Sequence, residues 1–153
     1  MIGSNDSNTS GLGTLETLTT TLIDSINGYR DAAEHAEGTR FQEIFRRNAD
    51  ERSRVVEELR AEITRLGGNA PDDGSFLGAT HQRFLDLKAA ITGRDDTAIV
   101  NEVERGEDYL KEKFELALKA DIDPQARTVI ERAYQSVRQG HDQISALKHG
   151  LEA

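Results

Sequence analysis

Four long segments of this chain carry apolar residues three and four positions apart, the spacing that gathers side chains on one face of an α-helix. The two prolines, Pro71 and Pro124, interrupt none of these segments, and the alternating pattern of strands is nearly absent. We therefore predict a single all-α domain over residues 14–149. Its long helices are expected at about residues 14–37, 39–66, 96–119 and 123–148.

Residues with capping chemistry mark the ends of these helices. Gly38 is expected to stop the first helix, and Thr39 with Gln42 three positions later predicts a capping box at the start of the second. A turn this short predicts that the two helices form an antiparallel hairpin. Asp123 followed by Pro124 predicts an N-cap and a proline at the first helical position of the fourth helix.

The connection between the second and third long helices is unusually long. After the predicted stop at Gly67 and Gly68, about 28 residues (68–95) pass before the next long helix, against the usual two to eight. This length predicts a crossover that makes the second and third helices parallel, as in ferritin-like four-helix bundles with one long crossover. Residues 79–92 within it have helical periodicity and predict a short extra helix.

Two further segments carry predictions about order and assembly. Residues 1–13 are rich in Gly, Ser and Asn and are expected to form a flexible N-terminal tail. The crossover holds more apolar side chains than one-sided packing needs, and exposed apolar patches mark contacts, so a homodimer is expected. Those side chains are Phe76, Leu77, Phe84 and Leu85.

Composition excludes several classes of site. The absence of cysteine excludes disulfides, thiolate catalysis and iron–sulfur clusters. With 28 Asp and Glu against 19 Lys and Arg, the formal net charge of −9 disfavours a nucleic acid partner. No run of 18 apolar residues occurs, and the first residues lack the pattern of a signal peptide, so we expect a cytoplasmic protein without a membrane partner.

Polar residues interrupt the apolar faces where a bundle core is expected. Asn48, Arg52, Glu107 and His141 fall at similar depths along the predicted helices, and Tyr29 joins them from the first. Buried polar groups are costly unless they are paired. These residues therefore predict either a structural network that fixes helix register or a metal site, and the sequence leaves both alternatives open.

Five short segments stand out together, and they are Gly28-Tyr29, Leu66-Gly67-Gly68, the stretch 86–93, Glu104-Arg105-Gly106-Glu107-Asp108 and His141-Asp142. In this combination the chain resembles an uncharacterised bacterial family of ferritin-like four-helix-bundle proteins of unknown function. The resemblance spans about Leu15 to Leu147 and implies a ferritin-like fold without indicating an activity.

The wider ferritin-like superfamily binds two metal ions with one Glu on each of two helices and a Glu-x-x-His motif on the other two. This chain has no Glu-x-x-His motif, and Arg52 would repel a cation in the middle of the second helix. An incomplete ligand set remains for Fe or Mn. Its members are Glu51, Glu104, Glu107 and His141.

Three functions follow as hypotheses. The leading one is a non-catalytic bundle, stress-related or an interaction protein, whose buried polar network is structural. Its members are Tyr29, Asn48, Arg52, Glu107 and His141. The alternative is a carboxylate-bridged Fe or Mn protein or oxidase with a degenerate site, and the third is an oligomeric partner-binding module. No Ser-His-Asp arrangement or phosphate-binding loop is present, so no catalytic residue and no cofactor is assigned.

Overall fold

The computed structural model describes residues 2–70 and 96–152. In these ranges the chain forms four α-helices and no strand, which confirms the predicted all-α class. The helices are α1 (Ile2–His35), α2 (Thr39–Arg65), α4 (Asp96–Lys119) and α5 (Pro124–Glu152).

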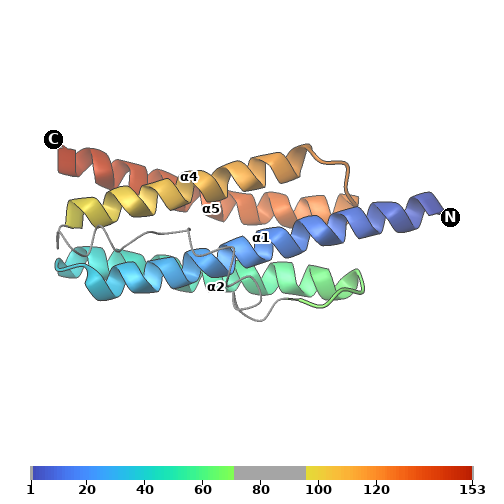
Figure 1. Cartoon of the computed structure of the whole chain (residues 1–153), viewed down its shortest axis with the longest axis horizontal. Helices are drawn as coiled ribbons and strands as arrows, with labels where there is room; N and C mark the ends of the chain where they lie inside the picture. The colour runs from blue at the N-terminus through green and yellow to red at the C-terminus, as the bar shows by residue number, and fades with distance from the viewer. Residues whose placement is uncertain (1, 71–95, 153) are drawn as a thin grey trace.

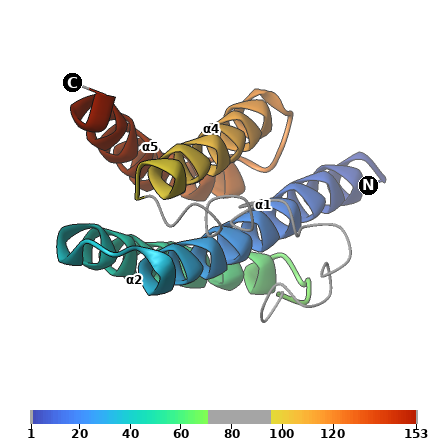
Figure 2. The ribbon, with the colours of Figure 1, turned by 60° about the vertical axis from the view of Figure 1, so that its left-hand side comes forward.

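The helices form two antiparallel hairpins that pack on each other (Figures 1 and 2). α1 packs on α2 and α4 on α5, and the hairpins meet through α1 with α4 and α2 with α5. α2 and α4 therefore lie diagonally opposite. Both begin at one end of the bundle, because the backbone N–H groups of Glu37 and Gly38 donate to the Asp96 carboxylate, each at 2.8 Å. The predicted crossover helix at 79–92 and the apolar residues Phe76, Leu77, Phe84 and Leu85 lie outside the described residues.

One continuous hydrophobic core runs between the four helices. All four helices contribute side chains with at most 2% exposure, so the predicted helical faces meet inside one domain. The largest of these apolar side chains are Leu15, Leu18, Leu22, Tyr29, Phe45, Leu59, Ile63, Ile99, Leu110, Phe114 and Ile130.

Two predicted helix ends are confirmed. Gly67 has φ of 85°, and N–H groups of Gly67 and Gly68 donate to the carbonyls of Thr64 and Ile63, the pattern of a Schellman motif. At the start of α5, the N–H of Ala126 donates to the Asp123 carboxylate at 3.0 Å. Here local sequence alone dictates the end, because the capping partners are within five residues of each other.

The predicted capping box at Thr39 is wrong. The N-cap of α2 is Gly38, and no side chain caps this helix. Gln42 instead donates to the Ala36 carbonyl at 2.8 Å. The Asp96 carboxylate, from the start of α4, accepts from the backbone N–H groups of Glu37 and Gly38, so a tertiary contact holds this turn.

The first helix starts earlier than the sequence indicates. α1 begins at Ile2 instead of about residue 14, so part of the segment expected as a tail is helical. Gly11 is buried, and a Cβ there would lie 3.7 to 3.8 Å from Ile122 and Asp123. Leu12 packs against the core. The loop between α4 and α5 thus gives this turn of α1 a surface to pack on.

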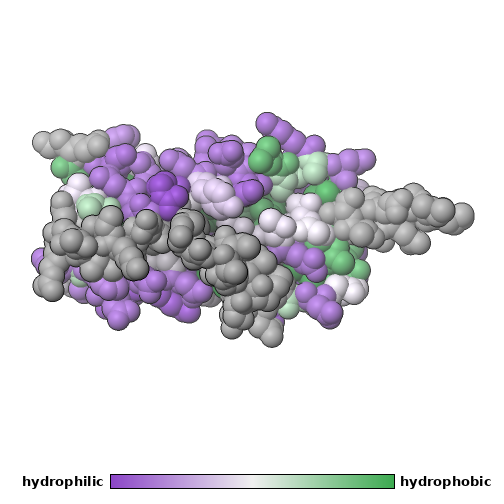
Figure 3. Space-filling model, in the orientation of Figure 1, coloured by the Kyte–Doolittle hydropathy of each residue, from purple (hydrophilic) through white to green (hydrophobic). Residues whose placement is uncertain are grey.

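The visible face of the molecule is largely hydrophilic, with hydrophobic residues gathered near the end of α4 (Figure 3). Leu116 of α4 is 54% exposed and lines a groove with Thr17 and Leu18 of α1. Within the described ranges, no helix combines the length and apolar character that crossing a membrane requires.

Candidate functional site

A fully buried ion pair occupies the centre of the bundle. Arg52 of α2 is 1% exposed and Glu107 of α4 is 0% exposed. Nη1 and Nη2 of Arg52 donate to Oε1 and Oε2 of Glu107 at 2.9 and 2.6 Å, a bidentate pairing. Nη1 also donates to the Ser25 hydroxyl of α1 at 3.1 Å. The pair therefore joins the two diagonal helices and ties both to α1.

Helix α5 approaches this pair with its backbone. A Cβ on Gly140 would lie 2.6 Å from Nη2 of Arg52 and 3.3 Å from Oε2 of Glu107. The first distance is shorter than van der Waals contact allows, so only glycine fits beside the guanidinium at this position. All four helices thus take part in enclosing the ion pair.

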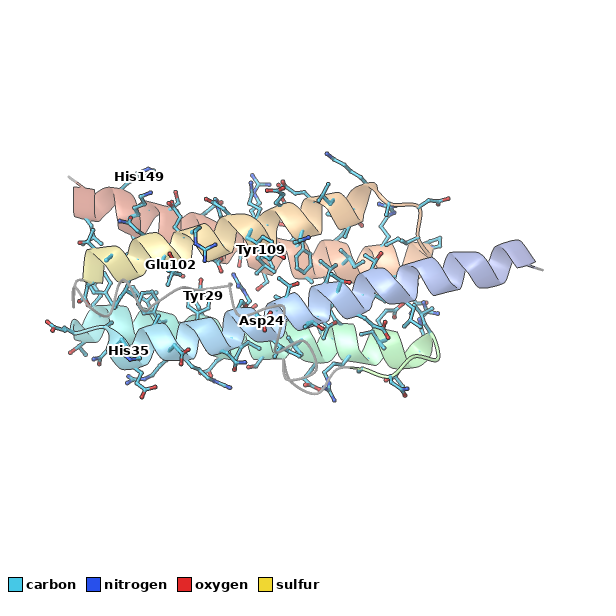
Figure 4. All side chains as sticks on the ribbon, in the orientation of Figure 1. Asp24, Tyr29, His35, Glu102, Tyr109 and His149 are labelled. Carbon is cyan, nitrogen blue, oxygen red and sulfur yellow. The ribbon has the colours of Figure 1, made fainter. Side chains whose placement is uncertain are left out.

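Tyr29 of α1 covers the guanidinium from one side. Its ring centroid lies 5.4 Å from Cζ of Arg52 and 6.1 Å from the Phe45 ring, and Figure 4 shows it pointing into the bundle. Its hydroxyl is near Asn48 and Glu107 but forms no well-aligned hydrogen bond within the described part of the chain. Burial raises the pKa of Tyr29 well above its usual value, and the charge of Glu107 adds to this effect, so the phenol stays neutral.

The charge state of Arg52 follows from the same contacts. Burial lowers the pKa of Arg52, but the Glu107 carboxylate outweighs this and holds the pKa above its usual value. The guanidinium is therefore a permanent buried cation. Its compensation depends on one carboxylate, because Ser25 contributes only a neutral hydroxyl.

His141 lies at the edge of the bundle, away from the Arg52–Glu107 pair. Its Nε2 is 2.6 Å from Asp108 and its Nδ1 is 3.2 Å from Asp142, both exposed. Burial opposes the charged form of His141, but hydrogen bonds to Asp142 and Asp108 leave its pKa above the usual value. The imidazole thus lies between two exposed carboxylates.

The structure places the four candidate metal ligands with four different sets of partners. Glu107 pairs with Arg52 and His141 with Asp108 and Asp142, while Glu104 accepts from Lys148 at 2.8 Å. Glu51 is 2.7 Å from Arg54 and accepts from the Ser136 hydroxyl at 2.8 Å. Over residues 2–70 and 96–152, no three His, Asp or Glu side chains gather as metal ligands would.

Sequence reasoning missed one buried acid. Asp24 of α1 is 7% exposed, and burial raises its pKa from 3.8 to about 7. A signal was present, because residues 11–29 hold only two charged residues, Glu16 and Asp24. A helix with so few charges is buried on most sides, and residues 18–26 are all buried.

The threonines of this segment are buried together with Asp24. Hydroxyls of Thr19, Thr20 and Thr21 donate to the carbonyls four residues earlier at 2.7 to 3.0 Å. This satisfies the hydroxyls inside α1 itself, so three polar side chains enter the core with their hydrogen bonds made locally.

An Asp24→Asn variant is expected to stabilise the protein at alkaline pH. The folded state holds the carboxyl proton up to about pH 7, whereas the unfolded chain loses it near 3.8, so stability falls as pH rises between these values. The gain should be near zero at about pH 4 and reach roughly 1–3 kcal/mol at about pH 8. Urea unfolding at both pH values measures it.

The matched control is Asp31→Asn, an exposed aspartate of the same helix. Its effect should stay within about 0.5 kcal/mol and should not depend on pH in this way. An Asp24→Asn gain that is the same at both pH values, or no gain at all, would contradict a protonated buried carboxyl.

Comparison with known proteins places the chain in a family. No curated protein matches it. One family profile matches residues 12–120, which contain Arg52 and Glu107 but end before α5 with Gly140 and His141. This confirms the expectation of an uncharacterised family. The chain belongs to the family defined by the domain of unknown function DUF2383.

Proposed function

We propose that this protein is a non-catalytic, ferritin-like helical bundle whose polar centre is structural. The observation that carries the proposal is the bidentate Arg52–Glu107 pair, buried at 1% and 0% exposure and enclosed by all four helices. The resemblance of the sequence and the common starting end of α2 and α4 support a ferritin-like arrangement.

The ion pair supports a structural role through its geometry. Two parallel hydrogen bonds between α2 and α4 form at one register only, because sliding either helix by one turn moves its charge by about 5.4 Å. A misregistered bundle would leave both charges buried without partners, which costs several kcal/mol. The pair therefore selects one alignment of the diagonal helices.

The same contacts bear on the Fe or Mn alternative. Arg52 places a fixed positive charge beside Glu107, and a cation there would compete with this guanidinium for the carboxylate. Glu51, Glu104 and His141 would each have to leave a present partner to join it. These costs favour the structural role.

Elemental analysis after anaerobic incubation with Fe(II), and separately Mn(II), tests the proposal on protein purified without a chelating tag. We expect metal far below one equivalent per chain. His141→Ala should cost less than about 1 kcal/mol, because its carboxylate partners are exposed.

His149→Ala is the matched control, since His149 is an exposed histidine of the same helix. Near-stoichiometric metal that His141→Ala abolishes and His149→Ala retains would overturn the structural role and make oxidase assays the next step.

A further inference from the structure

The outer face of α4 exposes large apolar side chains where the helix borders α1. Tyr109 is 47% and Leu116 is 54% exposed, and the only other exposed large hydrophobic residue of the described ranges is Leu151, at 37%. Tyr109 and Leu116 are seven positions apart, so they lie on one side of α4, about 10 Å apart along its axis. Hydrophobic surface gathers around this end of α4 in Figure 3.

A groove of about 330 Å³ opens beside Leu116, between α1 and α4. Much of its wall consists of small residues, which are Thr14 and Thr17 of α1 and Ala117 and Ala120 of α4. Lys113 is the one charged residue among its described lining residues, so an apolar side chain can enter with little cost from desolvated charge. We call Tyr109, Leu116 and this groove the α4 patch.

The α4 patch holds both a projection and a recess, which a two-fold symmetric contact needs. In such a contact, residue i of one copy meets residue j of the other, and j meets i. When two α4 helices pack antiparallel with the two-fold axis beside Lys113, midway between Tyr109 and Leu116, each Tyr109 lies opposite the other copy's Leu116. The ring of each copy then reaches the groove of the other, and both exposed apolar side chains are removed from water.

The charges along α4 favour this antiparallel arrangement. Residues 96–108 hold five acids and one arginine, whereas residues 109–119 hold three lysines and two glutamates. The first half keeps an excess of acids even without Glu107, which Arg52 neutralises. Antiparallel packing places the negative half of each α4 near the positive half of the other, while parallel packing would bring like charges together.

We propose that the α4 patch binds a second copy of the chain and that the protein forms a homodimer through antiparallel α4 helices. The contact lies on α4 instead of on the crossover, to which the sequence pointed. A patch of a few side chains on two helices buries less than the roughly 800 Å² per partner typical of stable complexes, so we expect a dissociation constant on the order of 100 µM. This dimer goes beyond the structural role of the buried centre and does not depend on it.

Sedimentation velocity of the full chain over about 5 to 500 µM, at an ionic strength that screens its net charge of −9, tests the proposal. We expect the mean mass to rise from that of one chain toward that of two. Leu116→Glu should raise the dissociation constant at least about tenfold, because each dimer would bury the introduced charge twice. The matched control is Leu151→Glu, at an exposed leucine near the opposite end of the bundle (Figure 1), which should dimerise as the wild type does.

Single-cysteine variants report the orientation of the two helices, because the chain itself contains no cysteine. In an antiparallel pair only positions near the two-fold axis meet their own copies, whereas in a parallel pair every position does. Under copper-catalysed air oxidation, Lys113→Cys should form an intermolecular disulfide at least about tenfold faster than Lys119→Cys. Equal rates for the two variants would refute the antiparallel contact.

Three outcomes of the sedimentation measurements would overturn the dimer. One is a mass of a single chain at every concentration. Another is such a monomer in which Leu116→Glu lowers the free energy of unfolding more than Leu151→Glu does, because residues 71–95 of the same chain would then be the occupant of the groove. The third is equal weakening by both substitutions, which would indicate general repulsion between acidic copies. None of these results changes the metal measurements that test the structural role.

Discussion

A Glu107→Leu variant should lose about 3–5 kcal/mol of its free energy of unfolding, because it leaves the guanidinium of Arg52 buried without a counter-charge. Both hydrogen bonds from Arg52 to the carboxylate disappear, and the existing bond to the neutral Ser25 hydroxyl remains. Arg52 does not escape the cost by losing its proton, because a guanidinium stays protonated throughout the working pH range. Urea unfolding near neutral pH, followed by circular dichroism, measures the loss.

Two comparisons separate this effect from a general loss of charge on α4. Glu112→Leu alters an exposed glutamate of the same helix and should change stability by less than about 0.5 kcal/mol. The double variant Arg52→Leu/Glu107→Leu removes both buried charges and should recover much of the loss, since apolar replacements of a buried pair are often neutral. A double variant as unstable as the sum of the singles would contradict coupling between the two residues.

A Gly140→Ala variant should lose about 1–3 kcal/mol, although alanine is the better helix former. Its Cβ would lie 2.6 Å from Nη2 of Arg52, and the guanidinium cannot move aside without breaking its bonds to Glu107. The overlap should outweigh the roughly 1 kcal/mol that alanine gains in a helix interior. Thermal and urea unfolding both report it.

Gly13→Ala is the matched control for this prediction. A Cβ at Gly13 of α1 would meet no atom within 4 Å, so the substitution should stabilise by up to about 1 kcal/mol. In the Arg52→Leu/Glu107→Leu background, Gly140→Ala should no longer be destabilising, because the obstructing nitrogen is gone. If both Gly→Ala substitutions raised the free energy of unfolding of the wild type, the side chain of Arg52 would be free to move and α5 would not confine it.

The helices and several of their ends could be predicted from local sequence. Apolar spacing of three and four residues located all four helices, and Gly67 and Asp123 marked ends that the structure confirms. These features depend on atoms a few residues apart. The start of α2 could not be predicted, because the carboxylate of Asp96, 58 residues away, binds the backbone of this turn at Gly38.

The candidate site could be predicted from the sequence only in part. Polar residues on apolar faces pointed to Arg52 and Glu107, but Glu104 lies one helical turn before Glu107 and could face Arg52 equally well. Side chains three positions apart on a helix differ by about 60° in direction, so a small rotation of α4 decides which acid faces inward. In the structure, Glu107 pairs with Arg52 and Glu104 pairs with Lys148.

The sequence by itself determined that this chain is helical and, apart from the start of α1, where the four described helices lie, because helix formation and amphipathic spacing are properties of neighbouring residues. Only the tertiary structure decided that Arg52 pairs with Glu107, that His141 turns to surface acids and that Asp24 is buried. Those outcomes depend on the rotation and depth of each helix in the bundle. Packing between the helices sets this rotation and depth, and the spacing of apolar residues in the sequence predicts them only to within a residue or two.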